Sequence, residues 1–221
     1  MKISTWNVNS VNARIEHLEK FIKKDQSDIY LLQELKTIED GFPKEIIKNA
    51  GYYSYVNGQK AWNGVAILSK EKLEITNSSI PQYDDPNARF IETEIRLKKI
   101  KKNIKLINIY LPNGNPIETE KFDYKIKWMK KFNSYIQELK DNNIPIIISG
   151  DFNVIPTDDD VYSPENFKND ACAHPLTREQ YRILINMGFT DLVKHFVEGK
   201  TNWTFWGYRG GGWQKGNGLR I

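Results

Sequence analysis

Short hydrophobic runs alternate with longer amphipathic stretches along this 221-residue chain. The short runs are rich in β-branched and aromatic residues, as the strands of a buried or half-buried sheet are. We therefore predict strands near residues 2–7, 28–33, 52–56, 63–69, 72–76, 90–97, 104–110, 144–150 and 202–207.

Three longer stretches predict helices. In residues 12–24 and 119–140, hydrophobic side chains recur every three or four positions and so share one helical face. Residues 178–187 predict a third helix, which Gly188 would end. Strands that alternate with helices in both halves of the chain suit two mostly antiparallel sheets packed face to face, with helices outside. We expect such an α/β fold, a four-layer α/β sandwich, as a single domain over residues 1–221.

Polar side chains stand where three of the predicted strands end. The hydrophobic run 144–149 leads into Gly150-Asp151-Phe152-Asn153, and two earlier strands end at Asn7 and Glu34. These carboxylate and amide oxygens, with no Cys or His beside them, suit Mg²⁺ or Mn²⁺ rather than zinc. The two asparagines have an alternative role, which is hydrogen bonding to the backbone of a local turn. A divalent ion held by few protein groups keeps positions open for a phosphate oxygen and a water, so the pattern predicts chemistry on phosphate.

A set of short motifs runs through the chain in a fixed order. They are WNVNS at 6–10, LQELK at 32–36, GQKAWNGVA at 58–66, YLPNG at 110–114, GDFN at 150–153, HPLTR at 174–178 and GLRI at 218–221. Their order and spacing resemble the exonuclease III and apurinic/apyrimidinic (AP) endonuclease branch of the endonuclease/exonuclease/phosphatase superfamily, in its bacterial exonuclease III type. The resemblance extends through essentially the whole chain and implies the same four-layer fold.

The resemblance also implies Mg²⁺-dependent hydrolysis of phosphodiesters at abasic sites and at the 3′ ends of duplex DNA. It implies Glu34 as the principal metal ligand, assisted by Asn7. Asp151 would donate a proton or position a second metal, and Asn153 would join the ligand set and orient the scissile phosphate. Tyr110 would hydrogen-bond a phosphate oxygen, although its position alone fits equally well with filling space at a strand end.

Further residues are implied as DNA contacts. Asn113 lies on the loop that follows Tyr110, and Arg89, Lys60 and Asn63 lie in matched segments near the DNA backbone. Contacts to phosphates raise affinity and salt dependence without reading sequence. An isolated arginine at the start of a strand is as often an ordinary surface charge.

A segment near the end of the chain interleaves aromatic and basic side chains around three glycines. Trp206, Arg209 and Trp213 are candidates for stacking on an unpaired base or holding an extrahelical abasic sugar. The alternative, which we expect for Trp203 and Phe205 and which also applies to Trp206, is that these rings are core residues of a strand. The glycines lack the Gly-x-x-x-x-Gly-Lys-Ser/Thr pattern, which excludes a P-loop NTPase.

Two charged runs have ordinary interpretations. The run Asp158-Asp159-Asp160 lacks the ligand spacing of a calcium loop and predicts a capped helix start or an acidic turn. The run Lys98-Lys99-Ile100-Lys101-Lys102-Asn103 predicts the turn of a hairpin between its two flanking strands.

The composition, with 39% hydrophobic residues, suits one globular domain. A formal charge of +4 mildly favours the approach of a polyanion. The single cysteine, Cys172, excludes an intrachain disulfide and suits a reducing compartment. No run is apolar and long enough to span a bilayer and no leader precedes the first strand, so we expect a cytoplasmic monomer that binds no membrane.

The family motifs continue past the point at which this sequence ends. In the family, the Leu-Arg-Ile segment runs into an Asp, and a later Ser-Asp-His segment supplies a metal-side Asp and the catalytic His. His17, His174 and His195 match neither. We therefore expect a chain that lacks the C-terminal strands of one sheet and has low or no activity. The alternatives are a non-catalytic DNA-binding remnant, or a phosphatase or phosphodiesterase of the same superfamily acting on inositol phosphates or lipids.

Overall fold

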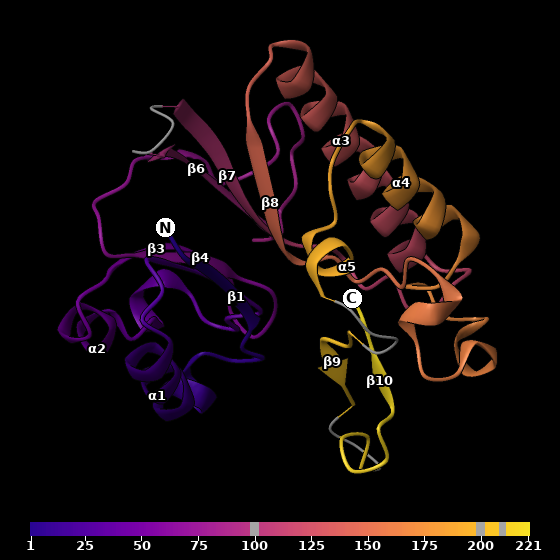
Figure 1. Ribbon diagram of the computed structural model, residues 1–221, viewed down its shortest axis with the longest axis horizontal. Coiled ribbons are helices and arrows are strands. Elements are labelled where there is room, and N and C mark those ends of the chain that lie inside the picture. The colour runs from indigo at the N-terminus through magenta and orange to yellow at the C-terminus, as the bar shows by residue number, and fades with distance from the viewer. Residues whose placement is uncertain (98–101, 198–201, 208–210) are drawn as a thin grey trace. The chain divides into compact units, whose positions relative to one another are not determined.

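The computed structural model describes residues 1–97, 102–197, 202–207 and 211–221 (Figure 1). Residues 98–101 of the predicted turn and the candidate Arg209 lie outside these residues, and the last two residues of that turn, Lys102 and Asn103, belong to strand β7 (Lys102–Tyr110). The chain divides into two compact units: a first unit of Met1–Tyr110 with Leu139–Asp151, and a second unit of Leu111–Glu138 with Phe152–Ile221. Each unit has hydrophobic clusters of its own.

Two four-stranded sheets form the framework of the first unit. The first sheet has the order β1 (Ile3–Asn7), β2 (Ile29–Gln33), β4 (Val65–Ser69), β3 (Tyr53–Asn57). β1 and β2 run parallel, and the other pairs are antiparallel. Every residue of β2 and β4 is buried, which accounts for their nearly unbroken hydrophobic runs.

The second sheet is also mixed. Its order is β5 (Ile75–Asn77), β6 (Phe90–Leu97), β7 (Lys102–Tyr110), β8 (Ile146–Asp151). β7 and β8 run parallel, whereas the other two pairs are antiparallel. Parallel pairing brings the carboxyl ends of β7 and β8 to the same edge, where Tyr110 and Asp151 are register partners.

The two sheets pack face to face through aliphatic side chains. These are Ile29, Leu31, Val65, Ile67, Ile91, Ile95, Ile104 and Leu106. A buried polar bridge crosses the same interface: Gln33 Nε2 donates to Asn108 Oδ1 at 2.7 Å. Asn108 Nδ2 in turn donates to the carbonyl oxygens of Leu32 at 3.0 Å and Ala66 at 2.9 Å. Because buried amides are costly to leave unpaired, the bridge favours one alignment of β2 and β4 against β7.

Helices cover the outer face of the first sheet (Figure 1). α1 (Ile15–Asp25) and α2 (Lys44–Asn49) contribute Leu18, Ile22 and Ile47 to the core on that face. Side chains of β2 alternate between this core and the one between the sheets, as strand geometry requires.

Two long helices lie side by side in the second unit (Figure 1). They are α3 (Glu120–Asp141), which ends within the first unit, and α4 (Pro175–Asn186). Asn133 Nδ2 of α3 donates to the carbonyl oxygen of Gln180 at 3.0 Å and so ties the pair together.

Shorter elements complete the molecule. They are α5 (Leu192–Phe196), the antiparallel pair β9 (Phe205–Trp206) and β10 (Gly218–Leu219), and 3₁₀ turns at Asn12–Arg14, Glu39–Gly41, Asp158–Asp160 and Pro164–Phe167. The last of the long predicted helices, α4, begins at Pro175 rather than at Arg178. His174 Nδ1 accepts a hydrogen bond from Leu176 N at 3.2 Å and caps the helix, which explains the earlier start.

The predicted α/β fold, with two packed sheets and flanking helices, is confirmed. The acidic run Asp158–Asp160 forms a capped helical turn as predicted, because Thr157 N and Oγ1 both donate to the Asp160 carboxylate, at 3.0 and 2.7 Å. The expectation that Phe205 is a core residue is wrong, since 38% of its surface is exposed. The short elements α2, α5 and β10 show too few residues to carry a hydrophobic period, so they were not predicted.

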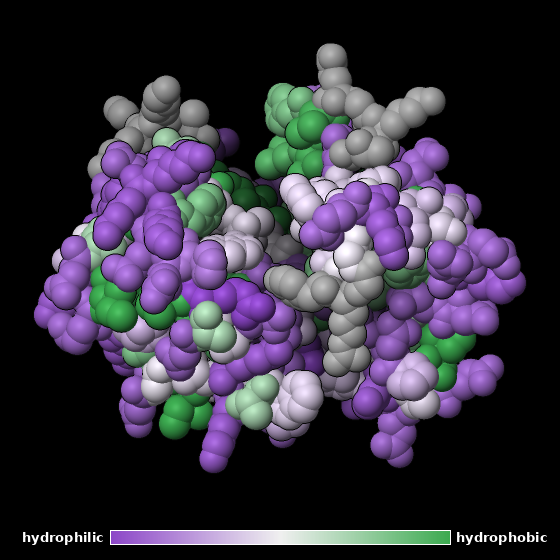
Figure 2. Space-filling model, turned by 90° about the horizontal axis from the view of Figure 1, so that it is seen from below, coloured by the Kyte–Doolittle hydropathy of each residue, from purple (hydrophilic) through white to green (hydrophobic). Residues whose placement is uncertain are grey.

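The face of the molecule drawn in Figure 2 is largely polar. Figure 2 shows a face covered mainly by hydrophilic side chains, with hydrophobic ones in smaller patches. Within the ranges given above, no helix combines the length and the apolar character needed to cross a bilayer.

A mostly buried charge cluster joins Arg220 to two carboxylates of the second unit. Arg220 Nε donates to Asp160 Oδ1 at 2.7 Å, and its Nη1 donates to Asp191 Oδ2 at 2.5 Å. The Tyr181 hydroxyl donates to the same Asp191 oxygen at 2.8 Å. Burial by itself would raise the pKa of both carboxyls, but the donors around them outweigh it and hold both pKa values below their usual range.

We expect this cluster to make the protein sensitive to acid. A carboxyl whose folded-state pKa is lowered stabilises the fold above its unfolded pKa of about 3.9, and this stabilisation is lost as the pH falls through the folded value. The melting temperature should therefore fall below about pH 4. Asp191→Asn should flatten that fall and lower the free energy of unfolding at neutral pH by about 1–3 kcal/mol.

Thermal unfolding followed by circular dichroism, at a series of pH values, measures both effects. Asp159→Asn, which changes an exposed carboxylate of the neighbouring 3₁₀ turn, is the control and should behave as the wild type. An Asp191→Asn variant with the acid sensitivity of the wild type would contradict the assignment.

Candidate active site

Asn7 and Asp151 meet where β1 and β8 end in the first unit. Asn7 Nδ2 donates to Asp151 Oδ2 at 2.8 Å, and Asn7 Oδ1 accepts from the backbone N–H of Asn9 at 3.0 Å. The side chain of Asn7 therefore bonds to a local turn and reaches a carboxylate at the same time. Asp151 is 8% exposed, so its charge lies where water screens it weakly.

Glu34 follows β2 in a left-handed backbone conformation, with φ 58°, which a residue other than glycine adopts only when its surroundings impose it. Its carbonyl oxygen accepts from Ser10 N at 2.8 Å, which fastens this turn to the loop after β1. Lys36 Nζ lies 3.0 Å from Glu34 Oε1 and donates to Asn9 Oδ1 at 2.6 Å. Glu34 keeps 20% of its side chain exposed, with Lys36 as its counter-charge.

Tyr110 lies beside both carboxylates. Burial raises the pKa of its phenol well above the usual value, and the negative charges of Glu34 and Asp151 raise it further. Arg89 stacks over the ring, with its guanidinium carbon 5.0 Å from the ring centroid, and its Nη1 donates to the Tyr110 carbonyl at 3.1 Å. The phenol therefore keeps its proton well past neutral pH and can donate a hydrogen bond.

The oxygen atoms gathered here fit a hard divalent cation. Glu34 and Asp151 supply carboxylate oxygens and Asn7 supplies an amide oxygen, which are the ligand types that Mg²⁺ prefers. These three side chains would leave a bound ion several water ligands, as Mg²⁺ commonly keeps. In the part of the chain that the structure describes, no group of three or more His, Cys, Asp or Glu side chains is close enough to hold an ion.

Asn113 and Asn153 form a separate pair in the second unit. Asn113 Nδ2 donates to Asn153 Oδ1 at 3.2 Å, and Asn153 Nδ2 donates to the carbonyl oxygen of Leu111 at 2.8 Å. Asn153 is 5% exposed, whereas Asn113 is exposed. One backbone partner of Asn153 therefore lies on the loop after β7.

Lys60 and Asn63 lie on the loop between β3 and β4. Asn63 is 7% exposed, and its Nδ2 donates to Gln59 Oε1 at 2.9 Å and to Asn87 Oδ1 at 3.1 Å, so this side chain supports the loop. Lys60 is exposed, and so is the neighbouring Trp62, at 69%. Trp62 was not a candidate from sequence, although an aromatic residue just before the loop-forming pair Asn63-Gly64 was a signal. DNA contacts by Lys60 and Asn63 stay predictions.

Trp206 and Trp213 contact each other in the second unit. Their ring centroids lie 4.5 Å apart and their planes cross at 66°. Trp213 is 67% exposed, whereas Trp206 is half-buried. Of these two rings, that of Trp213 is the one exposed enough to stack on a base, and Trp206 supports it from the side.

Two lysines near predicted site residues were not candidates from sequence. Lys36 pairs with a carboxylate of the site, and Lys125 of α3 is fully buried, with Nζ 2.6 Å from the carbonyl oxygen of Asn153. Lys125 could have been found, because it falls on the apolar face of the predicted helix, three residues after Phe122. Lys36 could have been found because it is the last residue of the motif LQELK at 32–36.

Known proteins match this chain over its whole length. The model of the Endonuclease/Exonuclease/phosphatase family matches residues 4–221. Exodeoxyribonuclease III of Haemophilus influenzae is 34% identical over 236 residues, which cover 100% of this chain and 85% of the relative. The exodeoxyribonuclease of Bacillus subtilis is 31% identical over 229 residues, which cover 100% of this chain and 86% of that relative.

Solved structures match the fold of this chain as well. A 3′ phosphatase, NExo, from Neisseria, bound to a product DNA hairpin, matches with a TM-score of 0.91 at 31% identity. An AP endonuclease from Archaeoglobus fulgidus matches with a TM-score of 0.89 at 32% identity. Each match covers 100% of this chain and 84% of the other. The chain therefore belongs to the endonuclease/exonuclease/phosphatase family, in its exonuclease III and AP endonuclease branch.

Proposed function

We propose that this protein is a Mg²⁺-dependent DNA repair nuclease of the exonuclease III type, which hydrolyses phosphodiesters at abasic sites and at the 3′ ends of duplex DNA. The observation that carries the proposal is the meeting of Asn7, Glu34, Tyr110 and Asp151 at the strand ends of the first unit. The names of the relatives, which include exodeoxyribonucleases and an AP endonuclease, support it. The protein would act as a cytoplasmic monomer, with residues 1–221 working as one domain.

The proposed chemistry assigns phosphate binding and proton transfer to separate groups. The protonated phenol of Tyr110 would donate a hydrogen bond to a non-bridging phosphate oxygen. Asp151, oriented by Asn7 through its Oδ2, would pass a proton to the leaving oxygen. Asn153 would orient the scissile phosphate with its amide, and Asn113 would contact the DNA next to it.

Glu34 is proposed as the principal ligand of Mg²⁺, for which Mn²⁺ could substitute. Asn7 would assist it, and Asp151 and Asn153 complete the proposed ligand set. When bound, the ion supplies neutralising charge at the phosphate and the leaving oxygen. Lys36 Nζ, 3.0 Å from Glu34 Oε1, would hold the carboxylate in place before an ion binds.

The proposed DNA contacts are of two kinds. Lys60, Asn63 and Arg89 would face the DNA backbone, which raises affinity and salt dependence without sequence preference. Trp213, supported by Trp206, would stack on an unpaired base or hold an extrahelical sugar. Arg209 is proposed as a further DNA contact.

Cleavage of a duplex that carries one labelled abasic-site analogue tests the proposal, in Mg²⁺ and in EDTA. Nicking that requires Mg²⁺ is the expected result. Binding of the duplex without cleavage would favour the non-catalytic alternative. Faster hydrolysis of a small chromogenic phosphodiester than of the abasic duplex would favour a phosphatase or phosphodiesterase.

We propose a low rate for these 221 residues assayed alone. His17 lies on α1, His174 at the start of α4 and His195 on α5, and none of them is among the site residues described above. A positioned general base contributes about 10²–10⁴-fold in rate. A chain extended by a family-type Ser-Asp-His terminus is the comparison, and equal rates for the two chains would contradict this proposal.

Tyr110→Phe should lower kcat by about 10–100-fold, because one hydrogen bond to a charged oxygen is worth about 1.5–3 kcal/mol. The fold should persist, since the ring still packs against Arg89. Because the pKa of the phenol lies well above its usual value, its ionisation should not lower the wild-type rate up to about pH 10. Steady-state kinetics across this range measures both effects.

The matched control is Tyr53→Phe, which changes a tyrosine that is 52% exposed on β3. It should leave kcat unchanged. A Tyr110→Phe variant as fast as the wild type would remove the phenol from the proposed phosphate site.

A further inference from the structure

A lysine with no exposed surface lies between two loops of the second unit. Lys125 of α3 is 0% exposed. Its Nζ donates to the carbonyl oxygen of Asn113 at 3.0 Å and to that of Asn153 at 2.6 Å. Asn113 belongs to the loop after β7 and Asn153 to the loop after β8. One ammonium group therefore holds together two loops that follow different strands.

The loop after β7 is shaped around the stem of Lys125. Gly114 has φ 86°, and a Cβ added there would come within 2.6 Å of the Lys125 side chain and 3.2 Å of Ala171 Cβ. Glycine at this position permits both the left-handed backbone and the close approach. The ammonium thus binds the carbonyl oxygen of Asn113, and the next residue, Gly114, allows the loop to close over the lysine.

The two residues whose carbonyls Lys125 binds are also linked through their side chains. Asn113 Nδ2 donates to Asn153 Oδ1, and Asn153 Nδ2 donates to the Leu111 carbonyl. The carbonyl groups of Asn113 and Asn153 are therefore held by Lys125, while their side-chain amides are held by hydrogen bonds to each other and to Leu111. An amide fixed in this way can meet a ligand with little reorganisation.

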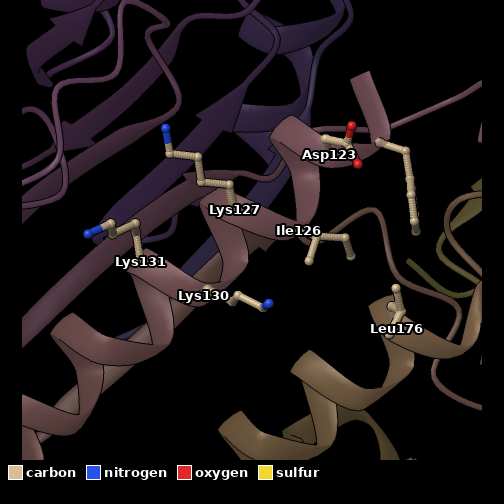
Figure 3. A pocket seen from close by; sticks show the side chains of 7 residues that line it. Asp123, Ile126, Lys127, Lys130, Lys131 and Leu176 are labelled. Carbon is tan, nitrogen blue, oxygen red and sulfur yellow. The ribbon is translucent and has the colours of Figure 1, made fainter. Parts of the chain in front are cut away.

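A buried ammonium is a costly way to join two loops. Lysine is seldom fully buried, because its charge must leave water. An apolar side chain of similar length would fill the space without that cost. Three other lysines of the same helix are exposed. They are Lys127, Lys130 and Lys131, which line an open pocket beside Leu176 (Figure 3). The charge at Lys125 therefore calls for a role other than packing.

We propose that Lys125 is a positioning residue for the phosphate of the DNA substrate. Its ammonium holds Asn113 and Asn153 in the orientation in which their amides meet an anionic oxygen, and it adds a fixed positive charge behind them. Because the group is buried, salt screens this charge only weakly. The inference rests on the proposed function, since it takes the phosphodiester of DNA as the anion. No bond or proton changes at Lys125 during the reaction.

Lys125→Met tests the proposal, because it keeps the length of the side chain and removes its donors and its charge. We expect kcat for Mg²⁺-dependent cleavage of the abasic duplex to fall about 10–100-fold, as for residues that orient a ligand from behind, with a smaller change in KM. Lys125→Arg keeps charge and donors and should recover part of the loss. Lys130→Met, on the exposed face of the same helix, should leave kcat unchanged.

A double-mutant cycle separates positioning from packing. If Lys125 acts through Asn153, Lys125→Met should cost little more in a chain that already carries Asn153→Ala. Losses that simply multiply in the double variant would overturn the proposal. Should Lys125→Met fail to fold, Lys125→Gln takes its place under the same criteria.

Nuclear magnetic resonance gives a readout that does not depend on cleavage. The side-chain NH₂ signals of Asn113 and Asn153 should shift in Lys125→Met, because the hydrogen bond between the two amides loosens, and stay unchanged in Lys130→Met. Unchanged signals in a folded Lys125→Met variant would overturn the proposal. A wild type that cleaves no duplex overturns the proposed function and this role with it, whereas a wild type that cleaves no faster than Lys125→Met overturns the role of Lys125 alone.

Discussion

Glu34→Gln should lower kcat/KM for cleavage of the abasic duplex by about 10³-fold, because the charge stabilisation that a divalent ion supplies is worth several kcal/mol. Glutamine keeps the shape of the side chain but offers a neutral oxygen, which binds Mg²⁺ more weakly than a carboxylate does. The variant also leaves Lys36, 3.0 Å away, without its counter-charge. The Lys36 ammonium, whose charge is then no longer balanced, would repel Mg²⁺ and weaken its binding further.

Two measurements separate ion binding from chemistry. The Mg²⁺ concentration that gives half-maximal cleavage should rise in Glu34→Gln, and calorimetric titration of the protein alone should show weaker binding of the ion. Glu39→Gln is the control, because Glu39 is 60% exposed and pairs with Lys44 on the surface. Wild-type rates in Glu34→Gln at every Mg²⁺ concentration would remove Glu34 from the proposed site.

Asp151→Asn should lower kcat by about 10²–10⁴-fold, the usual contribution of a positioned proton donor. Binding of the duplex should change little, since the two side chains have the same size and Asn7 can still hydrogen-bond to the new one. Single-turnover kinetics isolates the chemical step from binding and release. Asp40→Asn, on an exposed carboxylate of the first unit, should leave the rate unchanged.

The leaving group gives a sharper test of proton donation by Asp151. A substrate with sulfur in place of the leaving oxygen needs no proton, so the deficit of Asp151→Asn should shrink with it. A deficit of the same size on both substrates would reject proton donation. Asp151 would then serve the other role considered for it, which is to position a metal.

The sequence placed the site residues of the first unit at the ends of strands, and the structure agrees for Asn7, Glu34 and Asp151. Each follows a hydrophobic run whose length and residue types predict a strand, so local pattern is sufficient there. The contacts among these residues could not be predicted from such a pattern. The hydrogen bond between Asn7 and Asp151 joins residues 144 positions apart, and its geometry depends on the pairing of all the strands between them.

Lys125 and Phe205 show what a local sequence pattern does not predict. Helical periodicity put Lys125 on the apolar face of α3, but only the loops that close over it decide that the ammonium is buried. The hydrophobic pattern around Phe205 suggested a core strand. The strand has two residues, and a pair this short leaves 38% of the surface of Phe205 exposed. Burial of a single side chain depends on distant segments, which a local pattern does not contain.

The amide bridge between Gln33 and Asn108 ties the alignment of the sheets to the chemistry at their ends. Aliphatic contacts are non-directional, so they would tolerate a slide of one sheet along the other. The three hydrogen bonds of the bridge would not. Glu34 follows Gln33 directly, and Tyr110 lies two residues after Asn108, so the same bonds set the spacing between a carboxylate and a phenol of the proposed site.

A redesigned core with leucine in place of both amides could melt at the same temperature as the natural one, because buried polar groups often add little net stability. It would have lost the alignment of the two sheets that places Glu34 beside Tyr110. For this protein, thermal stability is therefore a poor guide to whether an altered core still works, and screens of such variants need an activity readout from the start.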